Sequence, residues 1–270
     1  MTLLVVGASG FLGAEVCRQA VAAGSRVIGT HHSAAVAVQG VEPRRLDVTD
    51  RAAVRALLTE VRPDAVVATP YRYDDWAVTA DGAAHIAYAA AEVGARLVHL
   101  SSDALHSGRP TPYLDDDPPT PIHPYGAAKA AAETAVRAID PGAMLVRTSL
   151  IVGEGSKQIA LCRDALAGRM ALFTDELRCP VDVSDLAAAV LELVPSGYAG
   201  PLNVAGPDPV SRAELGLLVA RRSGVDPAGL KTTTSAALGL HRPAEVRLDS
   251  SRAAGLLRTR LRGVTELLAA

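Results

Sequence analysis

Two side chains that could carry carbonyl chemistry lie four residues apart, at Tyr125 and Lys129. A helix puts this spacing on one face, and an ammonium close to a phenol favours ionisation of the phenol. Such a pair can donate a proton to a carbonyl oxygen. The same spacing also occurs in ordinary surface helices, so the motifs elsewhere in the chain decide which interpretation holds.

A short apolar run at 96–100 ends in Ser101, Ser102 and Asp103. Ligands of open α/β sheets bind at the carboxyl ends of the strands, where this run would deliver its hydroxyls. We expect Ser102 to orient a substrate carbonyl, Tyr125 to protonate it and Lys129 to hold the ribose of a nicotinamide cofactor. The alternative for Ser102 is a strand-end hydroxyl bonded to its own backbone.

A glycine-rich turn follows the first apolar run. Glycines there allow a tight turn and a close approach of the backbone to a pyrophosphate at the start of a helix. We therefore predict a dinucleotide site, with a purely structural turn as the alternative. The expected contacts are Gly7, Ser9, Gly10, Phe11, Leu12 and Gly13.

The second strand ends at His31, where NAD-preferring sites often carry a carboxylate for the ribose hydroxyls. Because a carboxylate is missing there, a 2′-phosphate is tolerated, and the sequence favours NADP(H) over NAD(H). Asp47 and Val48 are placed for the adenine, although Asp47 could instead cap the helix that starts near Asp50. The remaining predicted cofactor contacts are Ala68, Thr69, Ser101, Tyr125 and Lys129.

Short β-branched runs alternate with Ala- and Leu-rich stretches through the first two-thirds of the chain. Strands are predicted at residues 2–6, 26–28, 44–46, 65–68, 96–100 and 144–147. Helices are predicted at 11–23, 51–61, 79–93, 124–138 and 183–194. Continuous apolar strands with helical crossovers predict a parallel sheet covered on both faces, which is a Rossmann-type doubly wound α/β fold.

Residues 1–150 are expected to form the dinucleotide-binding domain, with return elements near 181–205 and a strand at 202–204. Residues 151–270 are expected to form mainly a small C-terminal substrate-binding lobe, with helices near 156–167, 211–223 and 260–269. Six prolines between 107 and 124 exclude regular structure there and predict a loop.

Composition restricts the classes of partner. The 270 residues are 49% hydrophobic and 21% charged, with a net charge of −2 and interleaved charges, so we expect a small-molecule substrate and no nucleic acid. We expect a cytoplasmic protein without a membrane segment, because the first apolar run is short and no 18-residue apolar span follows. His99, His106 and His123 lack metal-site spacing, so no metal is assigned, and the acidic run at 115–117 is interpreted as a solvated loop.

As an ordered set, these motifs resemble the extended short-chain dehydrogenase/reductases, and within them the dTDP-4-dehydrorhamnose reductase-like family of nucleotide-sugar reductases. The resemblance covers nearly the whole chain, and it implies that the Ser–Tyr–Lys triad falls on Ser102, Tyr125 and Lys129. It also implies a homodimer and a sugar-nucleotide pocket with substrate contacts at Tyr71, Asp103, Arg147 and Arg242. The matching segments are residues 7–13, 46–50, 62–64, 92–95, 101–103, 125–129, 147–149, 182–186, 242–243 and 248–249.

The chain departs from the family's pattern at 68–75 and at 104–106, next to the expected site. The leading hypothesis is an NAD(P)H-dependent reductase of a keto group on a nucleotide-linked sugar or a related small carbonyl compound. One alternative is a nucleotide-sugar epimerase that retains its NAD. Another is a non-catalytic, NADP-binding regulatory subunit, which the altered segments would suit.

Overall fold

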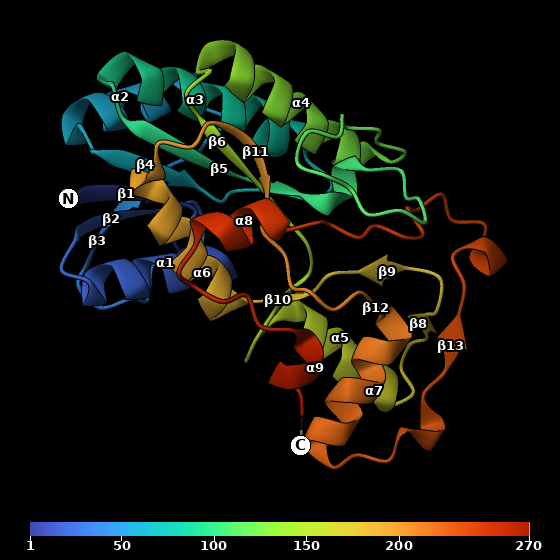
Figure 1. The fold of residues 1–270 in the computed structure, drawn as a ribbon. Coiled ribbons are helices and arrows are strands. Elements are labelled where there is room, and N and C mark those ends of the chain that lie inside the picture. Colours follow the sequence, from blue (N-terminus) through green and yellow to red (C-terminus); the bar gives the residue numbers. More distant parts are fainter. Residues whose placement is uncertain (270) are drawn as a thin grey trace.

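A seven-stranded parallel sheet organises the fold (Figure 1). The computed structural model describes residues 1–269. Its strands lie in the order β11-β6-β5-β4-β1-β2-β3, and every neighbouring pair is parallel. The predicted doubly wound α/β fold is confirmed. The strands are β1 (Thr2–Val6), β2 (Arg26–His31), β3 (Val41–Arg45), β4 (Ala65–Ala68), β5 (Arg96–Ser102), β6 (Met144–Thr148) and β11 (Gly200–Asn203).

Helices cover both faces of this sheet, as the near-continuous apolar strands require (Figure 1). On one face, α1 (Phe11–Ala22) packs against α6 (Val183–Leu193). On the other face, α3 (Gly82–Val93) lies between α2 (Arg51–Val61) and α4 (Pro124–Ile139). Each layer encloses its own buried aliphatic cluster, so side chains on alternate positions of the strands pack to opposite sides.

The boundaries differ from the prediction where local context outweighs propensity. Strand β3 starts three residues before the predicted 44–46 and includes Pro43, which is tolerated because β3 is an edge strand. The helix predicted over 79–93 begins instead with a π-helical turn, Ala77–Asp81, followed by α3. Single-turn π segments often occur at functional sites.

The chain after β6 forms a smaller layer and then returns to the sheet. Helices α5 (Lys157–Leu166) and α7 (Arg212–Ser223) pack together around a third apolar cluster. Between them, α6 and β11 rejoin the main layers. The short paired strands are β7 (Ile151–Val152) with β10 (Val181–Asp182), β9 (Leu177–Arg178) with β12 (Val210–Ser211), and β8 (Leu172–Phe173) with β13 (Thr232–Thr233).

The last elements are short. The helix predicted over 260–269 is limited to α9 (Val264–Leu267), and α8 (Ser251–Leu256) was not predicted. Single 3₁₀ turns lie at Asp103–Leu105, Val194–Ser196, Pro227–Gly229 and Ala236–Leu238. Within residues 1–269, none of the helices has the length and apolar character needed to cross a membrane.

The acidic run at 115–117 is not the solvated loop that we predicted. Asp115 is buried, and its carboxylate accepts the backbone N–H of Asn203 and pairs with Arg252. Asp117 pairs with Arg109, so only Asp116 is broadly exposed. The run therefore ties the proline-rich loop to the sheet edge at β11.

His106 gives the fold a testable dependence on pH. Its ring is fully buried, stacks on Tyr113 with centroids 3.9 Å apart, and has no hydrogen-bond partner within the described chain at either nitrogen. Burial lowers the pKa of His106 to about 3, from an ordinary value near 6.5. Because the unfolded chain then binds the proton more readily, stability is complete above about pH 6.5 and is lost as the pH falls towards 3.

We expect His106→Phe to reduce this acid sensitivity, since a phenyl ring keeps the stacking and carries no titrating group. One such group contributes a slope of about 1.4 kcal/mol per pH unit between these limits. Urea unfolding of both proteins at pH 7, 6 and 5 measures the slope. Parallel stability curves for wild type and variant would contradict the assignment.

Candidate active site

A close contact between two segments builds the candidate active site at the carboxyl edge of the sheet. Helix α4 begins immediately after His123, whose Nδ1 accepts the backbone N–H of Gly126 at 3.2 Å, and Pro124 occupies the first turn. A Cβ at Gly126 would lie 2.2 Å from the carbonyl oxygen of Ala104. Only glycine allows this approach, which places the first turn of α4 against the residues that follow β5.

The structure brings the three predicted catalytic residues to this edge. Ser102 ends β5, and its Oγ accepts the N–H of Ala104 at 3.2 Å and donates to Asp103 at 3.3 Å. Tyr125 lies in the first turn of α4, one turn before Lys129. Lys129 is buried, and its Nζ donates to the carbonyl oxygen of Leu100 on β5 at 2.8 Å.

Burial is the main cause of the pKa shifts of Tyr125 and Lys129. We predicted that the ammonium would favour ionisation of the phenol, but burial raises the pKa of Tyr125 above its usual value, and the Ser102 hydroxyl only partly opposes this rise. Burial also lowers the pKa of Lys129 to about 8, against the opposing charge of Glu133. At neutral pH, Tyr125 is therefore a protonated phenol, which is the form required of a proton donor.

Aromatic rings surround the phenol of Tyr125. Tyr73 stacks on it with centroids 4.8 Å apart and an interplanar angle of 22°, and Tyr71 packs at 5.7 Å and 52°. His123 stacks more loosely, at 6.3 Å from both Tyr73 and Tyr125. Sequence reasoning selected Tyr71 and missed Tyr73 and His123. A signal was available, because three of the few aromatic residues of this chain fall within 71–76.

The glycine turn has the form of a dinucleotide cradle. Gly7 adopts a φ of +85°, and a Cβ at Gly13 would lie 2.2 Å from the Gly7 carbonyl oxygen. Helix α1 begins at Phe11 after Gly10, and no side chain caps it. Its first N–H groups are thus available to an anion at the positive end of the helix. Ser9, Gly10 and Phe11 are exposed there, whereas Leu12 is buried.

The predicted adenine end holds polar side chains next to each other. Asp47 accepts the N–H and hydroxyl of Thr49 at 2.9 and 2.7 Å, and Asp50 caps α2, which settles the alternative in which Asp47 was the cap. His32 lies 3.6 Å from the Asp47 carboxylate. His31 ends β2, and its buried Nδ1 has no partner within the described residues.

The remaining predicted cofactor residues lie near the glycine turn or on the same sheet edge. The carbonyl oxygen of Val48 bonds to the ring of His85 at 3.0 Å. Thr69 donates its hydroxyl to Val6 at 2.8 Å and so joins β4 to β1 beside Gly7. Ala68 and Ser101 are buried at the ends of β4 and β5.

Two of the predicted substrate contacts have structural partners instead. Asp103 is buried and accepts the Ser149 hydroxyl at 2.6 Å. Arg147 is only 2% exposed and forms a bidentate pair with Glu133, at 3.0 and 2.8 Å. Its remaining nitrogen donates to the backbone of 115 and 117. The structure therefore corrects the prediction for Arg147, because all three nitrogens of this buried guanidinium are engaged in the core, which leaves it unable to reach a substrate.

Arg242 differs from Arg147 because it is partly exposed. Its Nε lies 3.0 Å from the carboxylate of Glu176, and its guanidinium lies over the ring of Phe173. Burial lowers the pKa of His123, and the charge of Arg242 acts in the same direction. Arg212 also lies near the fully buried Glu176, with its Nε 3.7 Å from the carboxylate, whereas Arg178 pairs with Asp103 at 3.8 Å.

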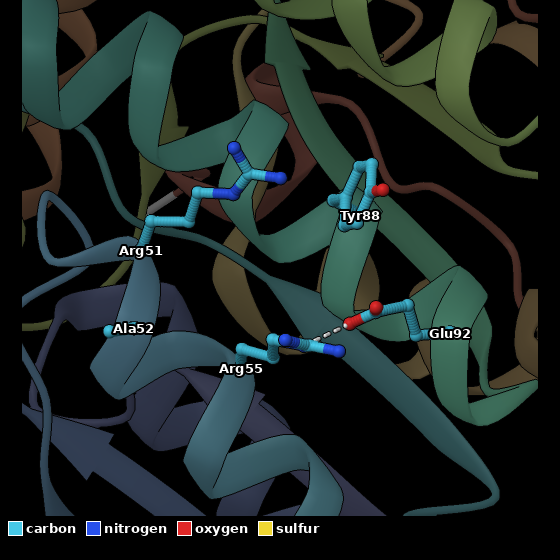
Figure 2. A pocket seen from close by; sticks show the side chains of 5 residues that line it. All are labelled: Arg51, Ala52, Arg55, Tyr88 and Glu92. Atoms are coloured by element: carbon cyan, nitrogen blue, oxygen red, sulfur yellow. Dashed lines mark hydrogen bonds and ion pairs between the residues drawn. The ribbon is translucent and has the colours of Figure 1, made fainter.

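A separate groove of about 410 Å³ lies between α2 and α3 (Figure 2). Arg51 lies over the Tyr88 ring there, and Arg55 bonds to Glu92 at 2.8 Å. Because these groups satisfy one another and none of the triad residues lines the groove, we assign it no part in the chemistry.

The doubly wound sheet, the uncapped glycine turn and the Ser, Tyr and Lys side chains together define the short-chain dehydrogenase/reductase class. The whole chain, residues 1–270, matches the family described as RmlD substrate binding domain. It therefore belongs to the RmlD family of extended short-chain dehydrogenase/reductases and is homologous to NAD(P)-dependent reductases.

Individual similar proteins support this family assignment. A dTDP-4-dehydrorhamnose reductase of Mycobacterium tuberculosis is 32% identical over 255 residues, covering 87% of this chain and 79% of the relative. The dTDP-4-dehydrorhamnose reductase of Streptomyces griseus is 34% identical over 284 residues, covering 94% and 88%. A crystal structure of a hypothetical dTDP-4-dehydrorhamnose reductase from Sulfolobus tokodaii has a TM-score of 0.85 at 28% identity, covering 97% of each chain.

The Arg147–Glu133 pair offers a test of its structural role. We expect Arg147→Met to destabilise the fold by about 3–5 kcal/mol, because it leaves the Glu133 carboxylate buried without its partner. Adding Glu133→Leu should recover a large part of this loss. Chemical denaturation of the two variants and of Glu133→Leu alone measures the coupling. A double variant no more stable than Arg147→Met would show that the pair is not the source of the effect.

Proposed function

We propose that this protein reduces a keto group on a nucleotide-linked sugar with hydride from a nicotinamide cofactor. One observation carries the proposal: Ser102, Tyr125 and Lys129 converge at the sheet edge that also presents the glycine turn of β1. The reductases of M. tuberculosis and S. griseus named above act on a 4-keto sugar attached to dTDP, as their names state. A 4-keto sugar on a nucleoside diphosphate is therefore the proposed substrate class.

Ser102, Tyr125 and Lys129 have separate roles in the proposed reaction. A nicotinamide cofactor held by the glycine turn and by Lys129 would supply the hydride for the carbonyl carbon. The Ser102 hydroxyl turns from Asp103 to the carbonyl oxygen and orients it, and the Tyr125 phenol transfers its proton to that oxygen as negative charge develops. The product is an alcohol, formed by one hydride and one proton. The proposed role of Lys129, whose Nζ donates to the Leu100 carbonyl, is to stabilise the phenolate left on Tyr125 by its positive charge.

The cofactor is proposed to be NADP(H) in preference to NAD(H). The end of β2 carries His31 and His32 in place of a carboxylate, so nothing on that strand repels a 2′-phosphate. A solved dTDP-4-dehydrorhamnose reductase from Bacillus anthracis, which shares the fold at 22% identity and a TM-score of 0.83, was crystallised with NADP. The homodimer and the cytoplasmic location expected from the sequence stay predictions.

Replacing the proton donor tests the proposed function. We expect Tyr125→Phe to lower kcat for NADPH-dependent reduction of dTDP-4-dehydrorhamnose by about 10²- to 10⁴-fold, while NADPH binding persists. Tyr88→Phe, on the outer face of α3, is the matched control and should keep full activity. Reduction by Tyr125→Phe at the wild-type rate would refute the proposed mechanism, and oxidised NAD retained through purification would favour an epimerase.

A substitution at the end of β2 tests the cofactor preference. We expect His31→Asp to raise the Kd for NADPH about tenfold or more and to change the Kd for NADH less, because a carboxylate there repels the 2′-phosphate and accepts ribose hydroxyls. Titration of protein fluorescence with each cofactor gives both constants. Equal changes for the two cofactors would place His31 away from the 2′ position.

A further inference from the structure

A buried hydroxyl without a partner lies beside the proposed catalytic serine. Thr148 is the last residue of β6, and the ladder between β5 and β6 pairs it with Ser102. Thr148 is only 6% exposed, and its Oγ1 is buried with no hydrogen-bond partner within the described residues. A buried hydroxyl that makes no hydrogen bond costs free energy. Position 148 therefore holds a polar group that the folded chain itself does not use.

Thr148 lies on the side of the sheet that helix α1 covers (Figure 1). Met144 and Val146, at the alternate positions of β6, pack in the same apolar cluster as Leu12 of α1. Thr148 continues this row at the carboxyl end of the strand. Tyr125 belongs to α4, which covers the opposite face. The unpartnered hydroxyl and the proposed proton donor thus belong to opposite faces of the sheet.

The segment that follows β6 leads from Thr148 to the glycine turn. A Cβ at Gly153 would lie 3.3 Å from Cζ of Phe11, the first residue of α1. In the proposed function, the glycine turn holds the pyrophosphate of the cofactor, and hydride transfer requires the nicotinamide end to lie beside a carbonyl held by Ser102. Thr148 lies next to Ser102 on the side of α1, so it is placed for the nicotinamide end.

We infer that the Thr148 hydroxyl binds the carboxamide of the nicotinamide ring and thereby limits rotation of that ring against the substrate carbonyl. A hydroxyl both donates and accepts hydrogen bonds, and it therefore matches a carboxamide, which does the same. Rotation about the Cα–Cβ bond moves the hydroxyl between staggered positions, so it can turn towards a ligand at the end of the strand. The inference rests on the proposed function for the presence of a nicotinamide cofactor.

Two ligands that share the adenosine half of the cofactor test this contact. Calorimetry measures the Kd of NADP⁺ and of 2′,5′-ADP, which lacks the nicotinamide half, for wild type, Thr148→Val and Thr148→Ser. We expect Thr148→Val to raise the Kd of NADP⁺ about three- to tenfold and to leave that of 2′,5′-ADP unchanged. Thr148→Ser keeps the hydroxyl and should bind NADP⁺ like wild type. Thr59→Val, on the exposed face of α2, is the matched control. If wild type prefers NAD⁺, the ligand pair is NAD⁺ and ADP-ribose.

Unfolding in urea gives an independent readout that needs no turnover. Valine replaces the unpaired hydroxyl with a methyl group, so we expect Thr148→Val without ligand to be at least as stable as wild type. Saturating NADP⁺ should stabilise Thr148→Val less than wild type, because its affinity for the ligand is lower. A ligand-free Thr148→Val that is less stable than wild type would overturn the inference, since the hydroxyl would then have a partner within the chain.

The binding results can also overturn the inference. Equal weakening of NADP⁺ and 2′,5′-ADP would show that the substitution acts on the whole cofactor site. Weaker binding of dTDP-rhamnose with an unchanged Kd for NADP⁺ would assign the hydroxyl to the substrate.

Other outcomes separate this inference from the proposed function. NADP⁺ binding that depends on the Thr148 hydroxyl, in a wild type that reduces no keto sugar, would end the proposed reductase function and leave the cofactor contact intact. Conversely, full turnover by wild type with an unchanged Kd for NADP⁺ in Thr148→Val would leave the reductase intact and exclude Thr148 from cofactor binding. A wild type that binds neither NADP⁺ nor NAD⁺ would overturn both.

Discussion

The site depends on the contact between the first turn of α4 and the backbone that follows β5. A glycine at position 126 is the condition for this contact, since any Cβ would collide with the Ala104 carbonyl oxygen. Once α4 is seated, Tyr125 faces Ser102, and Lys129 reaches the Leu100 carbonyl one turn later. The arrangement of these three side chains is therefore a consequence of helix packing. A hydroxyl from a strand end and a phenol and an ammonium from a helix meet because two backbones approach closely.

The same helix joins the site to the surrounding loops. Glu133 lies one further turn along α4, where its charge supports the ammonium of Lys129 and its oxygens hold Arg147. Arg147 in turn binds the backbone of the proline-rich loop at residues 115 and 117. A single face of α4 thus carries the proposed proton donor Tyr125, the ammonium of Lys129 and the carboxylate that holds Arg147 against the loop. Buried polar groups of this kind stabilise a structure only when all of them are paired.

Local sequence patterns predicted the parts of the fold that depend on periodicity and special residues. The apolar runs that became β1 and β4, and the glycines at 7, 10 and 13, needed no knowledge of distant contacts. The positions of Ser102 at the end of β5 and of Tyr125 and Lys129 one turn apart on α4 were also predictable, because they are local features, and their catalytic roles stay a proposal. The resemblance to a known family added the order of the motifs.

The residues whose roles were not predicted from the sequence are those whose contacts lie in other parts of the chain. Arg147 was expected in the substrate pocket, but its role depends on Glu133 and on a loop thirty residues away. Asp115 was expected in water, and its partner is the backbone of Asn203. Tyr73 gave a compositional signal, yet only the three-dimensional structure shows that its ring stacks on Tyr125 and that Thr79 anchors the neighbouring backbone of Arg72.

The electrostatics around Tyr125 set a condition on the proposed reaction. Burial and the neighbouring tyrosines keep the Tyr125 phenol protonated, and the loss of that proton requires a positive charge nearby. In the proposed mechanism Lys129 provides this charge, although burial lowers its own pKa to about 8. A phenolate and an ammonium in the same dry site stabilise each other, whereas either alone is penalised. Desolvation therefore opposes proton release from the phenol alone, and the proposed transfer depends on the ammonium of Lys129 to offset that cost.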